Sequence, residues 1–378
     1  MLDVAIVGGG PVGATAAALA GECGLAIAIF EARPGPSTQT RILALSHGSR
    51  EILDEAQAWP AERTTPITSI HISQRGGPGR ALLEAAEQGL PALGYTLSYG
   101  ELDAALNARL AAAGVPVRYG AACESLRLEP EHATLALASG EEVAARLVVI
   151  ADGGASAARI PGIAFTEKDY GQQAIVGTVR SDRPPAGRAY ERFTPQGPLA
   201  LLPVADHYAL VWTAHPGNAA ELLARDDAAF LVGLQEAFGD RAGRFESIAG
   251  RSSFPLKLRT VNTPVALRTV IVGNAAQALH PIAGQGLNLG LRDAAALASL
   301  LRATPRDALG ERAMLAAYRE ARRRDATRGV LFTDFLVGAF ADARRIPTWG
   351  RGLALAALDL VPGARRAIAD RMIYGAAS

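Results

Sequence analysis

The first twenty residues hold the feature that most constrains the fold of this 378-residue chain. A short apolar run at residues 3–7 leads into the glycine-rich segment 8–13 and then into the alanine-rich segment 14–20. Strand, glycine turn and helix in this order predict the first half of a βαβ unit, and therefore a parallel sheet. Few other architectures place three glycines between a buried strand and a helix.

The glycines of this turn have separate roles when such a unit binds a dinucleotide. Gly8 permits the tight bend, Gly10 lets the backbone approach a pyrophosphate, and Gly13 allows close packing of helix on strand. A second apolar run at 26–30 ends in Glu31, whose carboxylate can accept hydrogen bonds from ribose hydroxyls. The predicted nucleotide site comprises Gly8, Gly10, Pro11, Val12, Gly13, Glu31, Ala32 and Arg33. This fingerprint alone does not separate FAD from NAD.

A second loop-and-helix segment, residues 272–293, indicates which dinucleotide binds. It starts at the end of an apolar strand, passes through a loop with Pro281, Gly284 and Gly286, and enters a helix rich in Leu and Ala. Backbone N–H groups at a helix N-terminus favour negative charge. A reduced flavin carries its negative charge at one edge of its ring system, so the segment favours FAD.

The same segment reads Gly-Asn-Ala-Ala-Gln, then His-Pro-Ile-Ala-Gly-Gln-Gly-Leu-Asn-Leu-Gly. It resembles the second flavin-binding motif of the aromatic-hydroxylase flavoproteins, the p-hydroxybenzoate hydroxylase-like (class A) monooxygenases. Within that family it is similar to the branch of 2-polyprenyl-6-methoxyphenol hydroxylases of ubiquinone biosynthesis. Residues 190–203, Tyr-Glu-Arg-Phe-Thr-Pro-Gln-Gly-Pro-Leu-Ala-Leu-Leu-Pro, are similar to the same branch. The resemblance covers nearly the whole chain.

The resemblance implies further cofactor-binding residues. In the second motif these are Asn274, Pro281, Gly284, Gln285, Gly286, Leu287 and Asn288. It also implies that Arg41 reaches the flavin, and that Asp152 and Gly153 form a motif near the pyrophosphate that is associated with NAD(P)H use. The chain departs from the family at Asn274, where Asp is usual, and at Tyr99, near which an Arg is frequent. No cofactor role is therefore carried onto the Tyr99 position.

The reaction that the resemblance implies is hydroxylation of a polyprenylated phenol, 2-polyprenyl-6-methoxyphenol in particular, with NADH or NADPH as transient reductant and O2 as co-substrate. Two alternatives stay open: a flavoprotein of the same fold that acts on another aromatic or isoprenoid substrate, or an FAD-binding member of a membrane-docked biosynthetic complex with little catalysis of its own. Catalytic candidates are His280, Pro281 and Tyr190, and His47, Tyr208 and His215 are further acid–base candidates.

Composition excludes several other classes. The net charge is only +1, so nothing suggests a nucleic-acid partner. Cys23 and Cys123 do not form a CxxC pair, and the six histidines lack metal-ligand spacing, so we expect neither a disulfide reductase nor a metal site. No signal-peptide pattern precedes the first strand and no apolar run is long enough to span a bilayer. We expect a cytoplasmic location.

The expected fold is α/β: a Rossmann-like FAD-binding domain, an inserted antiparallel-sheet substrate domain, and C-terminal helices. The FAD-binding domain is assigned residues 1–70, 95–171 and 258–330, and the substrate domain residues 71–94 and 172–257. Strands are expected at 173–180, 190–194, 199–203, 208–213 and 248–257, helices at 101–113 and 226–238, and a polar, turn-rich stretch at 60–80.

The C-terminal region 331–378 combines apolar side chains at helical spacing with arginines. Between residues 341 and 378 six arginines oppose three aspartates, a net charge of +3. This pattern suits the surface of an anionic membrane. We predict peripheral attachment to the inner face of the cytoplasmic membrane, and contact with other ubiquinone-biosynthesis proteins. The alternative is that these helices pack on the flavin domain or form a dimer contact.

Overall fold

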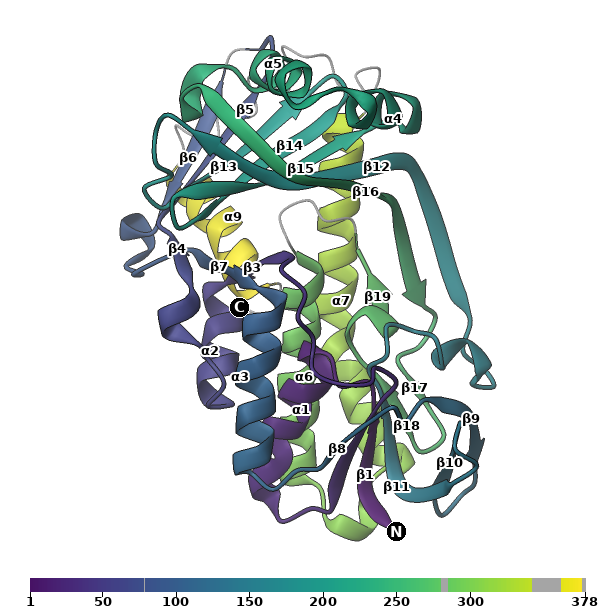
Figure 1. Cartoon of the computed structure of the whole chain (residues 1–378). Coiled ribbons are helices and arrows are strands. Elements are labelled where there is room, and N and C mark those ends of the chain that lie inside the picture. The colour runs from purple at the N-terminus through teal and green to yellow at the C-terminus, as the bar shows by residue number, and fades with distance from the viewer. Residues whose placement is uncertain (78, 280–284, 342–361, 376–378) are drawn as a thin grey trace.

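A computed structural model describes residues 1–77, 79–279, 285–341 and 362–375. A parallel sheet and its covering helices form one end of the molecule, and a large curved sheet with two helices on its far side forms the other (Figure 1). Two long strands run between the two ends. The expected α/β class, with a Rossmann-like sheet and a second, mostly antiparallel sheet, is confirmed.

The first sheet carries the N-terminal glycine motif. Its centre is five parallel strands in the order β8-β2-β1-β11-β18. Antiparallel strands extend it: β17 pairs with β18, and the hairpin of β9 and β10 joins the first half of β11 through β10. The strands are β1 (Leu2–Val7), β2 (Ile27–Glu31), β8 (Val117–Tyr119), β9 (Cys123–Leu128), β10 (Ala133–Leu137), β11 (Glu142–Ile150), β17 (Val265–Ala266) and β18 (Thr269–Ile271).

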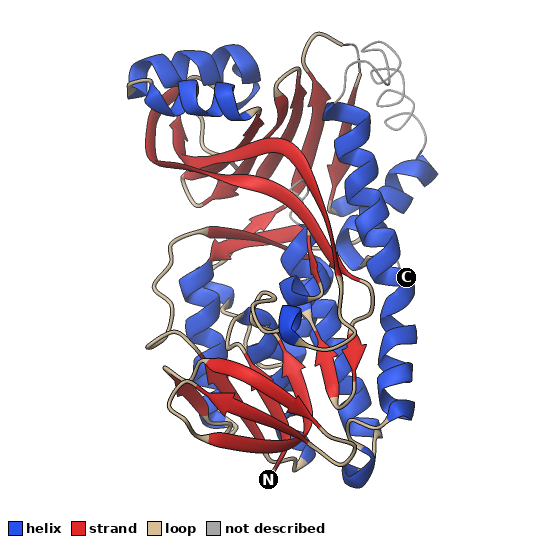
Figure 2. Ribbon diagram, turned by 90° about the vertical axis from the view of Figure 1, so that its right-hand side faces the viewer, coloured by secondary structure: helices blue, strands red, loops and turns tan. Residues whose placement is uncertain are grey.

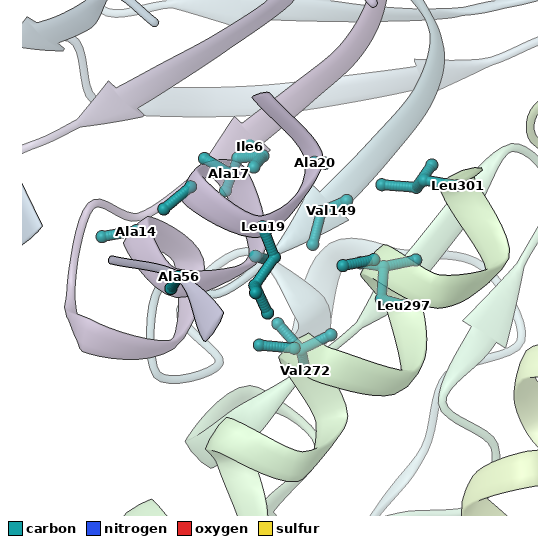
Figure 3. Packing of buried hydrophobic residues seen from close by; sticks show 14 of the residues in the cluster. Ile6, Ala14, Ala17, Leu19, Ala20, Ala56, Val149, Val272, Leu297 and Leu301 are labelled. Atoms are coloured by element: carbon teal, nitrogen blue, oxygen red, sulfur yellow. The ribbon is translucent and has the colours of Figure 1, made fainter. Parts of the chain in front are cut away.

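Helices cover one face of this sheet and enclose a continuous apolar core (Figure 3). Alanines 14, 16, 17, 18 and 20 let α1 lie close to its neighbours, and Val12 fills the gap beside Gly290 of α6. A Cβ at Gly290 would lie 2.7 Å from Val12 Cγ2, so the two helices need glycine there. The helices of this end are α1 (Pro11–Ala20), α2 (His47–Glu55), α3 (Tyr99–Ala112), α6 (Gln285–Ala303) and α7 (Arg312–Ala341).

The second sheet has eight strands in the order β19-β16-β12-β15-β14-β13-β5-β6. Neighbours are antiparallel except β13 and β5. Helices α4 (Pro216–Ala224) and α5 (Asp227–Phe238) cover its outer face through a core of buried aromatic side chains. The strands are β5 (Ser69–Gln74), β6 (Arg80–Glu84), β12 (Phe165–Ser181), β13 (Arg188–Thr194), β14 (Gly197–Val204), β15 (His207–Ala214), β16 (Phe245–Val261) and β19 (Gln277–Ala278).

A small third sheet joins the two ends. It has the order β3-β7-β4, with β3 (Ile42–Ser46), β4 (Thr65–Ile67) and β7 (Gly94–Ser98). The Thr96 hydroxyl on β7 donates to the carbonyl of Pro203 on β14, which fixes this sheet to the large one. Helix α9 (Pro362–Tyr374) lies beside this sheet (Figure 1), and Ile373 packs with Leu83 and Leu93. Figure 2 shows the parallel-sheet end at the bottom, near the N-terminus, and the large sheet with its two covering helices at the top.

Most expected elements are present, but three differences stand out. Residues 60–80, expected as a turn-rich stretch, contain strand β4 and strand β5, and β6 begins at Arg80. Pro66 lies within β4, an edge strand of the small sheet, and Gly76 and Gly79 lie between β5 and β6, so these residues do not exclude the strands. Helix α4 was not expected, and β12 and β16 are each 17 residues long, well beyond the predicted segments.

The division into two domains and a C-terminal region stays a prediction. Strands β5 and β6 share a sheet with β12–β16, as the assignment of 71–94 to the substrate side requires, but β5 begins at Ser69. Among the described residues, no helix combines the length and hydropathy needed to cross a bilayer. Part of the predicted membrane-facing segment, residues 342–361, lies outside the described residues.

Candidate functional site

The glycine turn after β1 forms a backbone cradle that side chains would fill. Gly8 has φ +104°, and a Cβ there would lie 2.6 Å from the backbone of Ala151. A Cβ at Gly13 would lie 2.2 Å from the Gly8 carbonyl oxygen. Gly10 differs, because a Cβ there would meet only the Tyr99 hydroxyl, at 3.4 Å. Gly8 and Gly13 are thus required by packing, whereas Gly10 leaves the start of α1 open to a ligand.

A cavity of about 480 Å³ opens at this cradle. Its walls come from chain segments far apart in sequence: the ends of β1 and β2, the loop before β3, the start of α3, the loops around β9 and after β11, and the loop and helix after β18. The lining residues are Val7, Gly8, Gly10, Pro11, Val12, Phe30, Glu31, Ala32, Arg41, Leu43, Tyr99, Ala122, Cys123, Ala151, Asp152, Gly153, Ala155, Ser156, Arg159, Asn274 and Leu287.

Glu31 ends β2 with its carboxylate held in place. Its Oε2 accepts from the N–H of Gly9 at 2.7 Å and its Oε1 from the N–H of Arg33 at 2.9 Å. Burial works against the charged form, but these N–H groups and the Arg33 guanidinium, 3.2 Å away, outweigh it and lower the pKa of Glu31. The carboxylate is therefore an ionised acceptor at neutral pH, with lone pairs left for a ribose.

Arg33 does not line the cavity. Its guanidinium lies 3.2 Å from Glu31 and 3.3 Å from Asp103, a buried residue of α3 that also accepts from the N–H of Ser37. Arg33 thus joins β2 to α3 behind the cavity wall. Its role as a cofactor-binding residue stays a prediction, and the contacts seen are with protein.

Asp152 organises the loop that follows β11. Its Oδ1 accepts from the N–H of Gly154 and its Oδ2 from the N–H of Ser156, at 2.9 and 2.8 Å. Gly153 and Gly154 both have positive φ, which favours glycine. Asp152 thus holds the backbone of its own loop, and Gly153 beside it faces the cavity.

A buried ion network supports the loop after β18. Asp293 of α6 accepts from the N–H of Gly273 at 2.9 Å, from Gln277 Nε2 at 2.6 Å and from Arg322 Nε at 2.7 Å. Asp325 lies 2.8 Å from the same Arg322 guanidinium. Burial disfavours the charged guanidinium, but the two carboxylates outweigh it and hold the pKa of Arg322 above its usual range. The network fixes Gly273, and with it the next residue in the cavity wall, Asn274.

The start of α6 reaches the same cavity through Leu287. Asn288 is buried, and its side chain accepts from the Ser46 N–H and the Ser49 hydroxyl while its amide donates to the Ala44 carbonyl. The Asn288 side chain therefore joins α6 to the end of β3 and the start of α2, and its role as a flavin contact stays a prediction. Across the cavity the Arg41 guanidinium lies over the Tyr99 ring, 5.3 Å from its centre.

The structure brings together most of the predicted cofactor-binding residues. Those in the cavity wall are Gly8, Gly10, Pro11, Val12, Glu31, Ala32, Arg41, Asp152, Gly153, Asn274 and Leu287. Gly13, Arg33, Gln285, Gly286 and Asn288 lie behind or beside it. His280, Pro281 and Gly284 lie outside the described residues.

The catalytic candidates on the large sheet are placed elsewhere. Tyr190 is buried between Tyr208 and Phe238, and its hydroxyl donates to the Arg241 carbonyl. Tyr208 is buried in the same core, beneath α4 and α5. Their side chains therefore point away from the flavin end of the molecule. His47 is buried at the start of α2 beside Tyr95, and exposed His215 directly precedes α4 without a capping hydrogen bond from its side chain.

Sequence reasoning missed several cavity residues. Tyr99, set aside because the family often has Arg nearby, lies in the wall, and Cys123 faces the cavity with its thiol pKa raised to about 11 by burial. A capping box from Ser98 and Glu101 starts α3 and so places Tyr99. The Ser-x-x-Glu pattern was a usable signal for that helix start. No local pattern marks Cys123.

The residues fit a flavin dinucleotide. The cavity offers a glycine backbone at a helix start for the pyrophosphate and an ionised carboxylate at the end of β2 for the ribose. The side-chain amide of Asn274, also in the wall, can accept from a further hydroxyl of the cofactor. Within the described residues, no three His, Cys, Asp or Glu side chains are arranged to hold a metal ion.

Comparison with known proteins agrees with this geometry. The family described as FAD binding domain matches residues 1–333. The chain is 35% identical over 373 residues to ubiquinone hydroxylase UbiL of Rhodospirillum rubrum, covering 94% of this chain and 86% of the relative. It is 33% identical over 311 residues to 3-demethoxyubiquinol 3-hydroxylase of Escherichia coli, covering 79% of each.

Solved structures share the fold. The p-nitrophenol 4-monooxygenase PnpA of Pseudomonas putida aligns over 99% of this chain and 98% of its own with a TM-score of 0.78 at 19% identity. P. aeruginosa PqsL aligns over 93% of this chain and 99% of its own with a TM-score of 0.77 at 22% identity. The chain belongs to the FAD-binding family of flavoprotein aromatic hydroxylases, whose members include its relatives named as ubiquinone-biosynthesis hydroxylases.

Proposed function

We propose that this protein hydroxylates the ring of a polyprenylated phenol, 2-polyprenyl-6-methoxyphenol in particular, in ubiquinone biosynthesis, with NADH or NADPH and O2. The observation that carries the proposal is a cavity lined by the glycine turn, Glu31 and Asn274, together with relatives over most of the chain that are named ubiquinone hydroxylase and 3-demethoxyubiquinol 3-hydroxylase. The chain contains one glycine fingerprint, so the nicotinamide cofactor visits transiently without a nucleotide-binding domain of its own.

Each part of the chain has a task in this proposal. Bound FAD supplies the activation of dioxygen and the transfer of one oxygen atom. The open backbone at Gly10 and the first turn of α1 would hold the pyrophosphate. Glu31 would accept from the adenosine ribose, and Asn274 would accept from the ribityl chain between the pyrophosphate and the flavin ring. The apolar face of the large sheet excludes water from the ring to be hydroxylated.

The proposal extends to location. A polyprenyl tail lives in the bilayer, so we propose a cytoplasmic protein that attaches to the inner face of the membrane through residues 331–378 and meets other ubiquinone-biosynthesis proteins there. In the described part of that region, Arg365 lies 3.2 Å from Glu87, and Arg371 donates to the Arg328 carbonyl. The arginines at 344, 345 and 351 are the ones assigned to the lipid surface.

The test is oxygen transfer by the purified FAD-loaded protein. With a 2-methoxyphenol that carries a short isoprenyl chain, NAD(P)H oxidation should accelerate, and the product should gain one oxygen atom that comes from labelled O2. The same assay without the isoprenyl chain measures how far the tail contributes to KM. Turnover of a different aromatic or isoprenoid compound, with none of this phenol, would favour the same-fold alternative.

A further inference from the structure

Strand β13 carries an acidic residue on the face of the large sheet opposite α4 and α5. Tyr190 contacts Phe238 of α5, and Arg192 Nε donates to the Ala237 carbonyl of the same helix. Because successive side chains on a strand point to opposite faces, Glu191 between them points the other way. That face is turned towards the flavin end of the molecule (Figure 1).

The neighbours of Glu191 on that face are apolar. In the register of the sheet, Ile72 of β5 and Ala200 of β14 flank Glu191, and Val211 of β15 follows Ala200. All three are half-buried. Ile72 also packs against the cluster that contains Ile373, so α9 lies against this edge of the face. Glu191 is thus a carboxylic acid whose neighbours on this face of the sheet are apolar.

The Glu191 side chain is half-buried. Its carboxyl has no hydrogen-bond or ion-pair partner in the part of the chain that the structure describes. Burial alone raises the pKa of this carboxyl to about 7. An unpaired acid in apolar surroundings costs stability, and strongly perturbed acids gather at functional sites.

Charged groups near Glu191 point elsewhere. On β13 itself, Arg188 and Arg192 share the face of Tyr190, and His71 of β5 contacts the Tyr190 ring. On α9, Arg365 pairs with Glu87 and Arg371 donates to the Arg328 carbonyl. Among the side chains that the structure describes, no neutralising charge accounts for the presence of this acid.

We propose that Glu191 exchanges a proton with the phenolic hydroxyl of the ring substrate, and this inference rests on the proposed function above. The ionised carboxylate accepts the phenolic proton: the phenol O–H bond breaks, a carboxyl O–H bond forms, and the electron pair stays on the phenolic oxygen. That oxygen then donates electron density into the ring at the positions open to hydroxylation. After oxygen transfer the carboxyl returns the proton to the product.

Proton exchange of this kind is efficient when the group titrates near the working pH. Glu191 satisfies that condition, and its apolar neighbours Ile72, Ala200 and Val211 offer a surface for the ring and its tail. Tyr190, the earlier acid–base candidate next to it in sequence, points into the core beneath α5 instead.

The test uses the FAD-loaded full chain, the short-chain 2-methoxyphenol as probe, and the variants Glu191→Gln and Glu191→Asp. Glu246→Gln is the matched control, because Glu246 is exposed on β16 of the same sheet. The first readout is the infrared band of a protonated carboxyl, which is independent of turnover. It should titrate near pH 7 in the wild type and the control, shift when the phenol binds, and be absent from Glu191→Gln.

The second readout is kcat/KM against pH. The wild type should rise through pH 7, Glu191→Gln should lose about 100-fold or more and become flat, and Glu191→Asp should recover part of the rate with its pH limb. FAD retention should match the wild type, and Glu191→Gln should melt no lower than the wild type, because it removes an unpaired acid. A Glu191→Gln protein with wild-type rate and profile would overturn the assignment of Glu191 alone. A wild type that neither binds nor hydroxylates the phenol would overturn the proposed function and this inference with it.

Discussion

Replacement of Asp293 by Asn tests how the loop after β18 is held. Asp293 accepts three hydrogen bonds, from Gly273, Gln277 and Arg322, and is 2% exposed. Asn keeps one acceptor oxygen and presents an N–H₂ group to the remaining donors, so at least one buried donor loses its partner. Removal of one member of a buried ion pair costs about 3–5 kcal/mol. Because Asp325 still faces Arg322, we expect the lower end, about 3 kcal/mol.

A loss of that size should lower Tm by roughly 4 °C in a chain of this length. It should also weaken FAD binding, because Gly273 precedes Asn274 in the cavity wall. The assays are thermal unfolding by circular dichroism and FAD titration by flavin fluorescence. Asp307→Asn, an exposed change just beyond α6, is the control. The double variant Asp293→Asn/Arg322→Gln should lose less than the sum of the single changes.

An Asp293→Asn protein with unchanged Tm and unchanged FAD affinity would refute the reasoning, since it would show that Gly273 holds its position without the carboxylate. Loss of stability with full FAD affinity would refute only the link between the network and the cavity. Additive effects in the double variant would show that Asp293 and Arg322 act separately.

Four further predictions follow from the structure. Gly13→Ala should abolish FAD binding or folding, because its Cβ would lie 2.2 Å from the Gly8 carbonyl; flavin absorbance after purification measures it. Asn274→Leu should weaken FAD binding by roughly 1–3 kcal/mol while Asn274→Asp retains it, and equal affinities would show that this side chain does not face the cofactor. Burial raises the pKa of Glu191 from 4.5 to about 7, so ionisation of its carboxyl destabilises the folded protein as pH rises through this range. In urea unfolding, the free energy of unfolding of the wild type minus that of Glu191→Gln should fall by about 3 kcal/mol between the lower and the upper pH. Replacing the arginines at 344, 345 and 351 with serine should reduce sedimentation with anionic liposomes at unchanged FAD content, and undiminished sedimentation would exclude attachment through them.

The cofactor end of the molecule is largely readable from sequence because its parts are local. A strand, a glycine turn and a helix determine one another over thirteen residues, so Gly8, Gly10 and Gly13 could be assigned separate roles. The role of Glu31 could be predicted because an acidic residue at the end of the second strand of such a unit lies beside the ribose. The second motif gave Asn274 by resemblance, and the cavity wall includes it.

The substrate end was less predictable because its contacts are not local. Strand β5 pairs in parallel with β13, and Arg188 Nε donates to Ser69 Oγ across 119 residues of sequence. Hydrophobic periodicity does not show that a segment pairs with a strand more than 100 residues away, so residues 60–80 were predicted to be turns. For the same reason Glu191 attracted no attention: alternation places it on a face, but only the sheet shows that this face is apolar and turned towards the flavin end.

The cofactor cavity is formed by segments that are far apart in the sequence and are therefore synthesised at different times. Asn288 of α6 accepts from the Ser46 N–H, a separation of 242 residues, and Asp293 fixes the loop that carries Asn274. A nascent chain that ends before α6 therefore has the glycine turn but no closed site. FAD can stabilise the protein only after synthesis is nearly complete, and it does so by mass action. The amount of this protein that survives quality control in a cell should consequently follow the supply of free FAD.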